Sequence, residues 1–363
     1  DNSDNTDSLC YSLIAADLDG NEIDELVVAQ QSKLTVFIDG EMENTVEDTS
    51  IDSGYGLASR NLFGNANEEL IVADNGGNIA IMQLEGSNLV PRQEWYSGYS
   101  MNAGAGITVS TNGHTNPWII HGSDAGMILA WEITSQDEHN QIWSTNSETN
   151  DNSVYSIEGG GAYGVAIGNI DDDENLEMLV GSSSGRVYAY DGVTYQTDWI
   201  SPELEKNVMG IAVGDLNGDG KLDVITSSMG GGTFGWYPNN GSGFDSRVQL
   251  GSGTYDHPND VKAVDMDGDG DLDVVSTSMN QVTWHENVNN GTQFNSNTIE
   301  SGIGGMYFLE VADMDGDSDF DIVAPSFNQN LHLWSMNDDL TFTRHDIGLG
   351  INNPYGVHVD DLD

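Results

Sequence analysis

The sequence predicts an all-β protein made of repeated antiparallel sheets, and three observations support this prediction. An acidic loop of nine residues recurs along the chain at nearly regular intervals. Short apolar runs rich in β-branched and aromatic residues follow the copies of this loop, which is typical of strands. No segment shows sustained helical periodicity. The chain of 363 residues is therefore expected to contain almost no helix.

The clearest copy of the loop lies within Val264–Val275, which reads V-D-M-D-G-D-G-D-L-D-V-V. Four acids stand at positions 1, 3, 5 and 9 of the loop: Asp265, Asp267, Asp269 and Asp273. Gly270 at position 6 can adopt the left-handed conformation that folds the loop back. Carboxylates that face one point repel one another unless a hard cation lies between them, and calcium takes six to eight oxygens from such groups. The backbone carbonyl of Asp271, at position 7, would supply one more oxygen.

Four further copies carry a full ligand set, again with a backbone carbonyl at position 7. In order of positions 1, 3, 5, 7 and 9 they are Asp17, Asp19, Asn21, Ile23 and Glu25; Asn169, Asp171, Asp173, Asn175 and Glu177; Asp215, Asn217, Asp219, Lys221 and Asp223; and Asp313, Asp315, Asp317, Asp319 and Asp321. Two copies have lost the set, because Asn61–Glu69 keeps one acid at these positions and Thr111–Pro117 keeps none. We therefore predict about five calcium ions per chain.

The spacing of the loops predicts the architecture. First positions fall at 17, 61, about 111, 169, 215, 265, 313 and 361, a period of roughly 44 to 58 residues. Four short strands per period are typical of a β-propeller with four-stranded antiparallel blades. Seven blades are predicted, with eight as the alternative, because the chain ends inside an eighth loop at Asp361 and Asp363.

The elements are expected in the same order in every repeat. Residues 1–8 form a polar tail, and residues 9–363 form one domain. Repeats start near residues 9, 55, 104, 163, 209, 259 and 306, and an incomplete eighth covers 355–363. The innermost strand precedes the loop, the second strand follows position 9, and the third carries an aromatic residue. In the first repeat a weak outer strand is expected near Thr45–Ile51.

The repeated unit resembles a known family. The run G-V-A-I-G-N-I-D-D-D-E-N-L-E-M-L-V-G, Gly164–Gly181, is similar to the FG-GAP/VCBS repeat of integrin-type β-propellers. This resemblance extends over essentially the whole chain and implies a calcium loop between the first two strands of each blade. It leaves the function open, since such propellers occur in adhesion proteins, lectins, polysaccharide lyases and surface proteins.

Composition restricts the partners and the location. Only 9 Lys+Arg stand against 60 Asp+Glu, which gives a formal net charge of -51. This surface would repel nucleic acid and anionic membranes, and no apolar stretch is long enough to insert into a membrane. The single cysteine, Cys10, lies in an apolar run and is expected to be a buried thiol. We expect an extracellular or cell-surface protein, with its signal segment removed or not included.

Aromatic residues fall into two sets. Trp131, Tyr190, Trp236, Trp284 and Trp334 recur at one place in the repeat and are expected to fill the core. The less regular Trp95, Tyr96, Tyr99, Trp118 and Trp143 are candidates for a ligand-binding face. Asn240 and Asn290 lie in sequons for N-linked glycan, at tips where Asn-Gly also predicts a hairpin turn.

No catalytic motif is found in the sequence. Lys206, Lys262, Arg247, Arg344 and His257 could serve a polysaccharide lyase, but nothing in the sequence brings them together. We therefore expect a calcium-stabilised, non-catalytic module that binds or adheres to a glycan or a protein. The alternatives are a structural subunit of an extracellular filament or surface layer, whose partner is another copy of the chain, and a lyase.

Overall fold

The computed structural model describes residues 10–20, 25–30, 33–38, 41–46, 54–64, 67–74, 76–86, 88–98, 107–110, 116–122, 128–144, 162–171, 173, 175–182, 184–194, 196–205, 207–251, 253–314, 317–326, 330–337 and 339–347. These residues form 28 strands and no helix, which confirms the all-β prediction. The predicted tail 1–8 and the incomplete repeat 355–363 lie outside the described residues. Within the described residues no helix is long and apolar enough to span a membrane.

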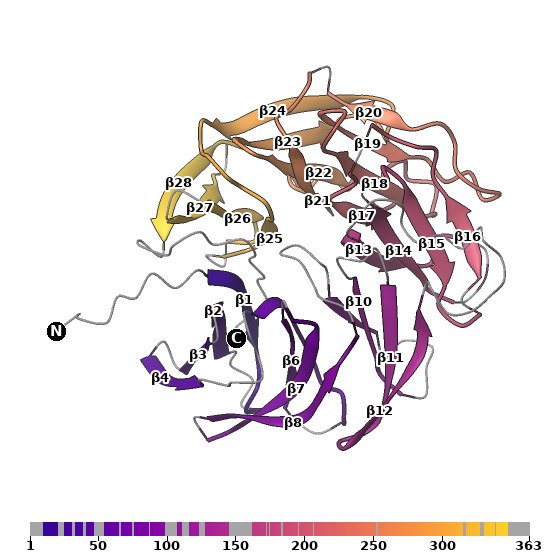
Figure 1. Ribbon diagram of the computed structural model, residues 1–363. Helices are drawn as coiled ribbons and strands as arrows, with labels where there is room; N and C mark the ends of the chain where they lie inside the picture. Colours follow the sequence, from indigo (N-terminus) through magenta and orange to yellow (C-terminus); the bar gives the residue numbers. More distant parts are fainter. Residues whose placement is uncertain are drawn as a thin grey trace. The chain divides into compact units, whose positions relative to one another are not determined.

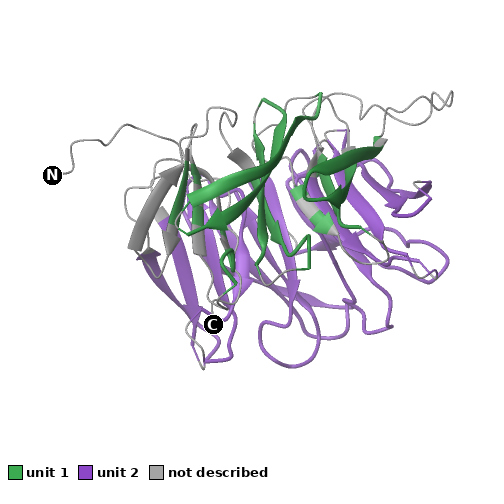
Figure 2. Ribbon diagram, turned by 90° about the horizontal axis from the view of Figure 1, so that it is seen from below, with its two compact units in different colours: residues 1–156, 348–363 green, residues 157–347 purple. Residues whose placement is uncertain are grey.

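The chain divides into two compact units (Figure 2), residues 1–156 with 348–363 and residues 157–347. The first unit has three four-stranded sheets: β1 (Cys10–Ala16), β2 (Glu25–Gln30), β3 (Lys33–Ile38) and β4 (Glu41–Val46); β5 (Gly54–Arg60), β6 (Glu69–Asp74), β7 (Asn78–Glu85) and β8 (Asn88–Tyr96); and β9 (Ile107–Ser110), β10 (Trp118–Gly122), β11 (Ile128–Ser135) and β12 (Glu138–Ser144).

The second unit has four such sheets, which Figure 1 labels in chain order. They are β13 (Ala162–Gly168), β14 (Glu177–Ser182), β15 (Val187–Asp191) and β16 (Thr197–Ile200); β17 (Ile211–Gly214), β18 (Asp223–Ser228), β19 (Thr233–Tyr237) and β20 (Val248–Leu250); β21 (Pro258–Val264), β22 (Asp273–Ser278), β23 (Gln281–Asn287) and β24 (Phe294–Ser301); and β25 (Glu310–Ala312), β26 (Asp321–Ser326), β27 (Asn330–Met336) and β28 (Phe342–Ile347).

Every sheet is an antiparallel meander in which strand order follows chain order. Seven four-stranded sheets are thus present among the described residues, and closure of a ring of seven or eight blades in one domain stays a prediction. The outer strand of the first sheet, β4, begins earlier than the predicted Thr45–Ile51. Ile38 pairs with Glu41 across a two-residue connection, which the Asp39-Gly40 dipeptide favours.

Apolar cores lie between neighbouring sheets of the same unit. Strand β18 supplies Val224 to the cluster shared with β14 and β15 and Ile225 to the cluster shared with β21 and β22. Because both of its faces are covered, all six residues of β18 are buried, as are those of β6, β14, β22 and β26. The outer strand β24 is largely exposed. The acidic loops at 169, 215, 265 and 313 therefore start at the end of a first strand and lead into a strand buried on both faces.

Candidate metal centres

The 215 and 265 loops share one backbone conformation. Glycines with positive φ stand at positions 4 and 6, with values of 71° and 85° for Gly218 and Gly220 and of 72° and 96° for Gly268 and Gly270. In the last described loop Ser318 occupies position 6 with a φ of 80°. A non-glycine residue rarely adopts this conformation. The loop retains it because its hydrogen bonds require it.

Two hydrogen bonds repeat from loop to loop and turn the acids inward. The position 6 N–H donates to the position 1 carboxylate, and the position 7 N–H donates to the position 5 carboxylate. The first kind joins Gly220 to Asp215 Oδ2 at 2.8 Å, Gly270 to Asp265 Oδ2 at 3.0 Å and Ser318 to Asp313 Oδ2 at 2.9 Å. The second joins Lys221 to Asp219 at 3.0 Å, Asp271 to Asp269 at 2.8 Å and Asp319 to Asp317 at 2.9 Å.

The acid at position 9 opens the second strand and is almost completely buried in five repeats, with at most 1 % of its surface exposed. One of its oxygens accepts the N–H of position 2 in each of them. These pairs are Leu62 with Glu69 at 2.7 Å, Ile170 with Glu177 at 2.7 Å, Leu216 with Asp223 at 2.9 Å, Met266 with Asp273 at 3.1 Å and Met314 with Asp321 at 3.0 Å. The position 9 acid therefore closes the loop whether or not it also binds a cation.

The other oxygen of the position 9 acid reaches the third strand. Backbone N–H groups donate from Asn239 to Asp223 at 2.7 Å, from Asn287 to Asp273 at 2.7 Å and from Met336 to Asp321 at 2.9 Å. In the repeat that lacks the ligand set, Gln83 Nε2 donates to Glu69 Oε1 at 2.6 Å. The sequence pattern identified position 9 only as a ligand. Its structural role depends on the register of the second and third strands, which no spacing along the chain reveals.

Three groups of acids come close enough to share an ion. Ligand oxygens within 4.8 Å of one another occur in Asp171, Asp173 and Glu177; in Glu177, Asp191 and Asp198; and in Asp265, Asp267 and Asp269. Within the described residues, Asp265 Oδ1 is buried and has no hydrogen-bond partner. A buried carboxylate oxygen without a partner is costly, and a divalent cation satisfies it. The donor set therefore fits a hard cation such as calcium.

Burial shifts the position 9 acids toward their neutral form. Loss of hydration raises the pKa of Asp273 to about 7, against the hydrogen bonds from Asn287, Trp284 and Met266 that lower it. The same cause raises the pKa of Glu177 to about 7 and that of Asp223 to about 6. The nearby acids of each loop raise these pKa values further. A bound cation would oppose both effects.

These pKa values predict that protons compete with calcium. Because the pKa of Asp273 is raised in the folded state, its neutral form stabilises the metal-free fold. This contribution to stability is lost as the pH rises through about 7. Calcium binding needs the ionised acid, so between pH 8 and pH 6 the affinity should fall about tenfold in the loops of Asp273 and Glu177 and about twofold in the loop of Asp223. Calorimetric titration with calcium at the two pH values measures this change. Equal affinities at both would contradict it.

The remaining predicted ligands lie as follows. Gly20 N–H donates to Asp17 Oδ1 at 2.7 Å, and Asp19 is exposed. In the 169 loop, Asn169 Nδ2 donates to the Asp173 carbonyl at 2.6 Å. In the 215 loop, Asn217 Oδ1 accepts the Asp219 N–H at 3.0 Å. The residues Asn21, Ile23, Asn65, Thr111–Thr115 and Asp315 and the side chain of Glu25 lie outside the described part of the chain.

In two repeats an asparagine at the end of the third strand contacts the loop of the repeat before it. Asn239 Nδ2 donates to the carbonyl of Ile170 at 2.7 Å, and Asn287 Nδ2 donates to that of Leu216 at 2.8 Å. Both acceptors are position 2 residues of the preceding loop. The loops are therefore coupled to the packing of neighbouring sheets within the second unit.

The burial of the aromatic residues agrees with the prediction for the regular set and differs from it for part of the irregular set. Trp131, Tyr190, Trp236, Trp284 and Trp334 are 1 to 7 % exposed, which confirms the core prediction. The ligand-face prediction is wrong for Trp118, which is 6 % exposed because β10 is covered on both faces. Trp95 is half-buried and stacks on His139 with ring centroids 4.0 Å apart, whereas Tyr96 is exposed. Tyr99 and the side chains of Trp143 and Cys10 lie outside the described residues.

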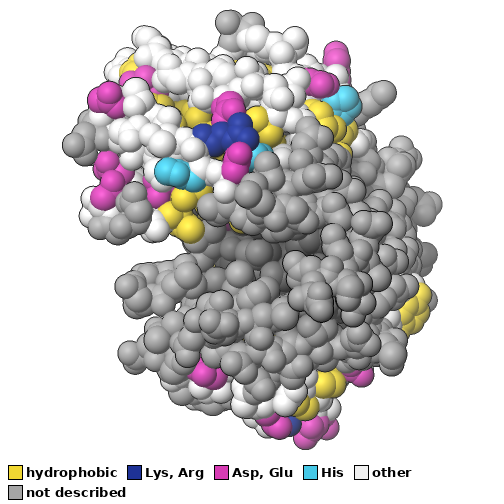
Figure 3. Space-filling view, turned by 90° about the vertical axis from the view of Figure 1, so that its left-hand side faces the viewer, with side chains coloured by type: hydrophobic (Ala, Val, Ile, Leu, Met, Phe, Trp, Pro, Cys, Tyr) yellow, Lys and Arg dark blue, Asp and Glu magenta, His cyan; other side chains and the backbone are white. Residues whose placement is uncertain are grey.

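The basic residues considered for a lyase are dispersed and engaged. Lys262 pairs with Glu310 at 2.9 Å, Arg344 pairs with Glu300 at 2.6 Å, and Arg247 Nε donates to Thr226 Oγ1 at 3.0 Å. His257 contacts Asp256 at 2.6 Å, and Lys206 lies outside the described residues. On the face drawn in Figure 3 the basic side chains are few and lie beside acidic ones.

A Ser-His-Asp series that the sequence analysis missed crosses the last sheet. Ser326 Oγ lies 2.9 Å from His332 Nε2, and His332 Nδ1 lies 2.7 Å from Asp346 Oδ1. Ser326 is 1 % exposed, so no substrate reaches its hydroxyl. The preceding sheet has a similar series without the acid, in which buried Ser276 and His285 lead to exposed Ser296. We interpret both series as polar links between strands.

The two sequon asparagines are exposed at hairpin tips. Asn290 and Gly291 have φ values of 44° and 75°, which confirms the predicted hairpin turn. Asn240 Oδ1 accepts the N–H of Ser242 at 3.0 Å. Glycosylation at either site stays a prediction.

Repeated four-stranded meanders, most of them with an acidic loop between the first and second strands, define a repeat protein of the β-propeller type. The model of the FG-GAP-like repeat matches residues 169–226, 215–276 and 265–324, from one loop into the next repeat. Residues 169–324 therefore carry FG-GAP-like repeats, as the sequence resemblance predicted.

Solved structures agree on the fold. The computationally designed protein Ika8 has a TM-score of 0.64 at 11 % identity, over 99 % of this chain and 92 % of that one. Sqt1 of Saccharomyces cerevisiae has a TM-score of 0.64 at 12 % identity, over 95 % and 86 %. BBS1N, solved in complex with ARL6DN, has a TM-score of 0.58 at 15 % identity, over 92 % and 95 %. No curated protein matches the chain by sequence.

Proposed function

We propose that this chain is a calcium-stabilised, non-catalytic binding module that works outside the cell or at its surface and recognises a neutral glycan. Its sheets would close into a propeller, and the side chains at positions 1, 3, 5 and 9 of the loops, with the backbone carbonyl at position 7, would hold the ions. Calcium supplies a cross-link between the first and second strands of a repeat. The acidic composition suits calcium-containing, salty surroundings that screen self-repulsion.

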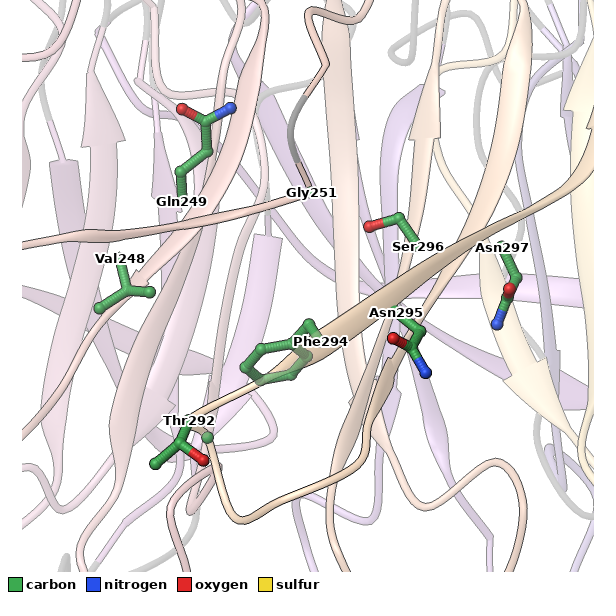
Figure 4. A pocket seen from close by; sticks show the side chains of 9 residues that line it. Val248, Gln249, Gly251, Thr292, Phe294, Asn295, Ser296 and Asn297 are labelled. Atoms are coloured by element: carbon green, nitrogen blue, oxygen red, sulfur yellow. The ribbon is translucent and has the colours of Figure 1, made fainter.

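One observation carries the ligand class: an uncharged groove in a strongly acidic chain. The groove has a volume of about 640 Å³ and lies between β20 and β24. Its lining residues are Val248, Gln249, Gly251, Gly291, Thr292, Phe294, Asn295, Ser296 and Asn297, none of which is charged. In the view of Figure 4 the Phe294 ring lies between Val248 and Asn295.

This lining has the chemistry that a sugar requires. Amides and hydroxyls both donate and accept hydrogen bonds, as sugar hydroxyls do, and an aromatic ring can pack against the apolar face of a sugar ring. Asn295 and Asn297 each donate to Glu286 Oε2, at 3.3 Å and 3.4 Å, which orients their amides. With a net charge of -51 the chain disfavours anionic glycans. These features support a neutral saccharide.

Replacement of Phe294 by Ala tests the groove. An array of neutral and anionic oligosaccharides first identifies a bound neutral glycan, and the variant should bind that glycan at least about tenfold more weakly, as expected when a central aromatic contact is lost. The matched control is Phe342→Ala, because each ring lies 6.4 Å from the tryptophan on the third strand of the preceding sheet, Phe294 from Trp236 and Phe342 from Trp284. Phe342 is not among the groove residues.

The control variant should bind normally. A chain that binds no neutral glycan, or equal binding by the wild type and the Phe294 variant, would contradict this site. Binding of a protein partner with no glycan would favour the protein-binding form of the same module.

A further inference from the structure

The repeat from 162 to 200 departs from its neighbours at two positions that face the same place. Position 9 is Glu177 here and aspartate in the next three repeats. Glu177 pairs with Asp191 across β14 and β15. By strand register Asp191, at the end of the third strand, corresponds to Pro238, Glu286 and Ser335 in the next three repeats. Glu177 is the longer acid, and Asp191 opposite it places a second carboxylate at the same edge of the sheet.

The longer side chain leaves one oxygen open. Glu177 Oε2 accepts the Ile170 N–H, but Oε1 is buried and has no hydrogen-bond partner within the described residues. In the next three repeats the corresponding oxygen accepts a backbone N–H from the third strand. In this repeat the corresponding N–H, that of Gly192, instead donates to the carbonyl of Leu176 at 2.9 Å. Glu177 is 0 % exposed, so bulk solvent does not reach this oxygen.

Two carboxylates from other strands approach this acid. Oxygens of Glu177, Asp191 and Asp198 lie within 4.8 Å of one another. Two oxygens on one calcium ion, each at about 2.4 Å from it, are at most about 4.8 Å apart. Asp198 on β16 is exposed, so an ion has access from solvent. Asp191 also accepts hydrogen bonds from Val193 N–H at 2.9 Å, from Thr194 N–H and from Asn175 Nδ2 at 3.0 Å, which hold it in place.

We propose that this repeat binds a second divalent cation of the calcium type through Glu177, Asp191 and Asp198, in addition to the ion of the 169 loop. Glu177 belongs to both acidic groups and would bridge the two ions. Five carboxylates converge here, and one divalent ion would leave about three of their charges uncompensated. The second ion offsets most of that excess. The proposal rests on the loop ion of the proposed function only through the shared Glu177.

Counting bound ions in single and double variants of the full-length chain tests this proposal. Native mass spectrometry at saturating calcium gives the number of ions on the wild type, Asp171→Asn, Asp198→Asn and the double variant. Each single variant should lose one ion, and the double variant should lose two. Asp245→Asn, an exposed acid of the next repeat, is the control and should lose none. Melting curves in chelator verify that all variants are folded.

The outcomes separate the two proposals. An Asp198 variant that keeps every ion, or a double variant that loses only one, would overturn the second site, because the five acids would then hold a single ion. A folded wild-type chain that binds no calcium would refute the calcium loops themselves.

Discussion

Removal of calcium by excess chelator is expected to lower the melting temperature by tens of degrees. Each loop brings several carboxylates together, and at an effective dielectric of about 20 two such charges about 4 Å apart repel by roughly 4 kcal/mol before relaxation. An ion present at about a thousand times its Kd stabilises the fold by about 4 kcal/mol per site. Because the loops are coupled to neighbouring sheets through Asn239 and Asn287, the losses should reach the whole of the second unit.

Scanning calorimetry with calcium, with chelator, and with calcium restored after chelation measures this effect. Restoration should return the original melting curve, which excludes damage by the chelator. A melting curve that chelator leaves unchanged would show that the loops are stable as bare acidic turns.

Replacement of Asp273 by Ala should destabilise the chain by about 3 to 5 kcal/mol, with or without calcium. Its carboxylate accepts the N–H groups of Met266 and Asn287 and the ring N–H of Trp284, at 3.1 Å, 2.7 Å and 3.0 Å. Removal leaves three buried donors without a partner, each costing about 1 to 3 kcal/mol. The damage therefore comes from the fold itself.

Asp267→Ala is the matched comparison within the same loop. Asp267 accepts one loop N–H, from Asp269 at 3.2 Å, and it is partly exposed. Loss of the Asp267 carboxylate should lower the free energy of unfolding in calcium, because a ligand is removed. In chelator it should change that free energy little, because one repulsive charge is removed as well. Urea unfolding of both variants in both conditions gives four free energies. If the two variants respond alike to chelator, position 9 has no structural role apart from the metal.

The sequence predicted the repeat and the loop frame well because both depend on local spacing. Asp265, Asp267 and Asp269 are close together in the chain, and the loop turns them toward one point. The double role of Asp273 was not predictable in this way, because Asn287 lies fourteen residues further along and reaches Asp273 only through strand pairing. The Asn61–Glu69 loop shows the separation of roles, since Glu69 still accepts the Leu62 N–H although the ligand set is lost.

Binding surfaces were harder to predict than metal loops. Trp118 seemed a candidate because it breaks the periodic aromatic pattern, yet its strand is covered on both faces. The groove combines Val248 and Phe294, which belong to different sheets and follow no common spacing. Likewise Glu177, Asp191 and Asp198 come from three strands of one sheet. Only tertiary structure brings such residues together.

The central claim is that the acidic loops hold calcium. A crystal structure of the chain grown in calcium tests this claim most directly. The account predicts an ion in the loops that start at Asp17, Asn169, Asp215, Asp265 and Asp313, and none in Asn61–Glu69 or Thr111–Pro117. Loops without ions at saturating calcium, or an ion in either of the two loops that lack the ligand set, would contradict it.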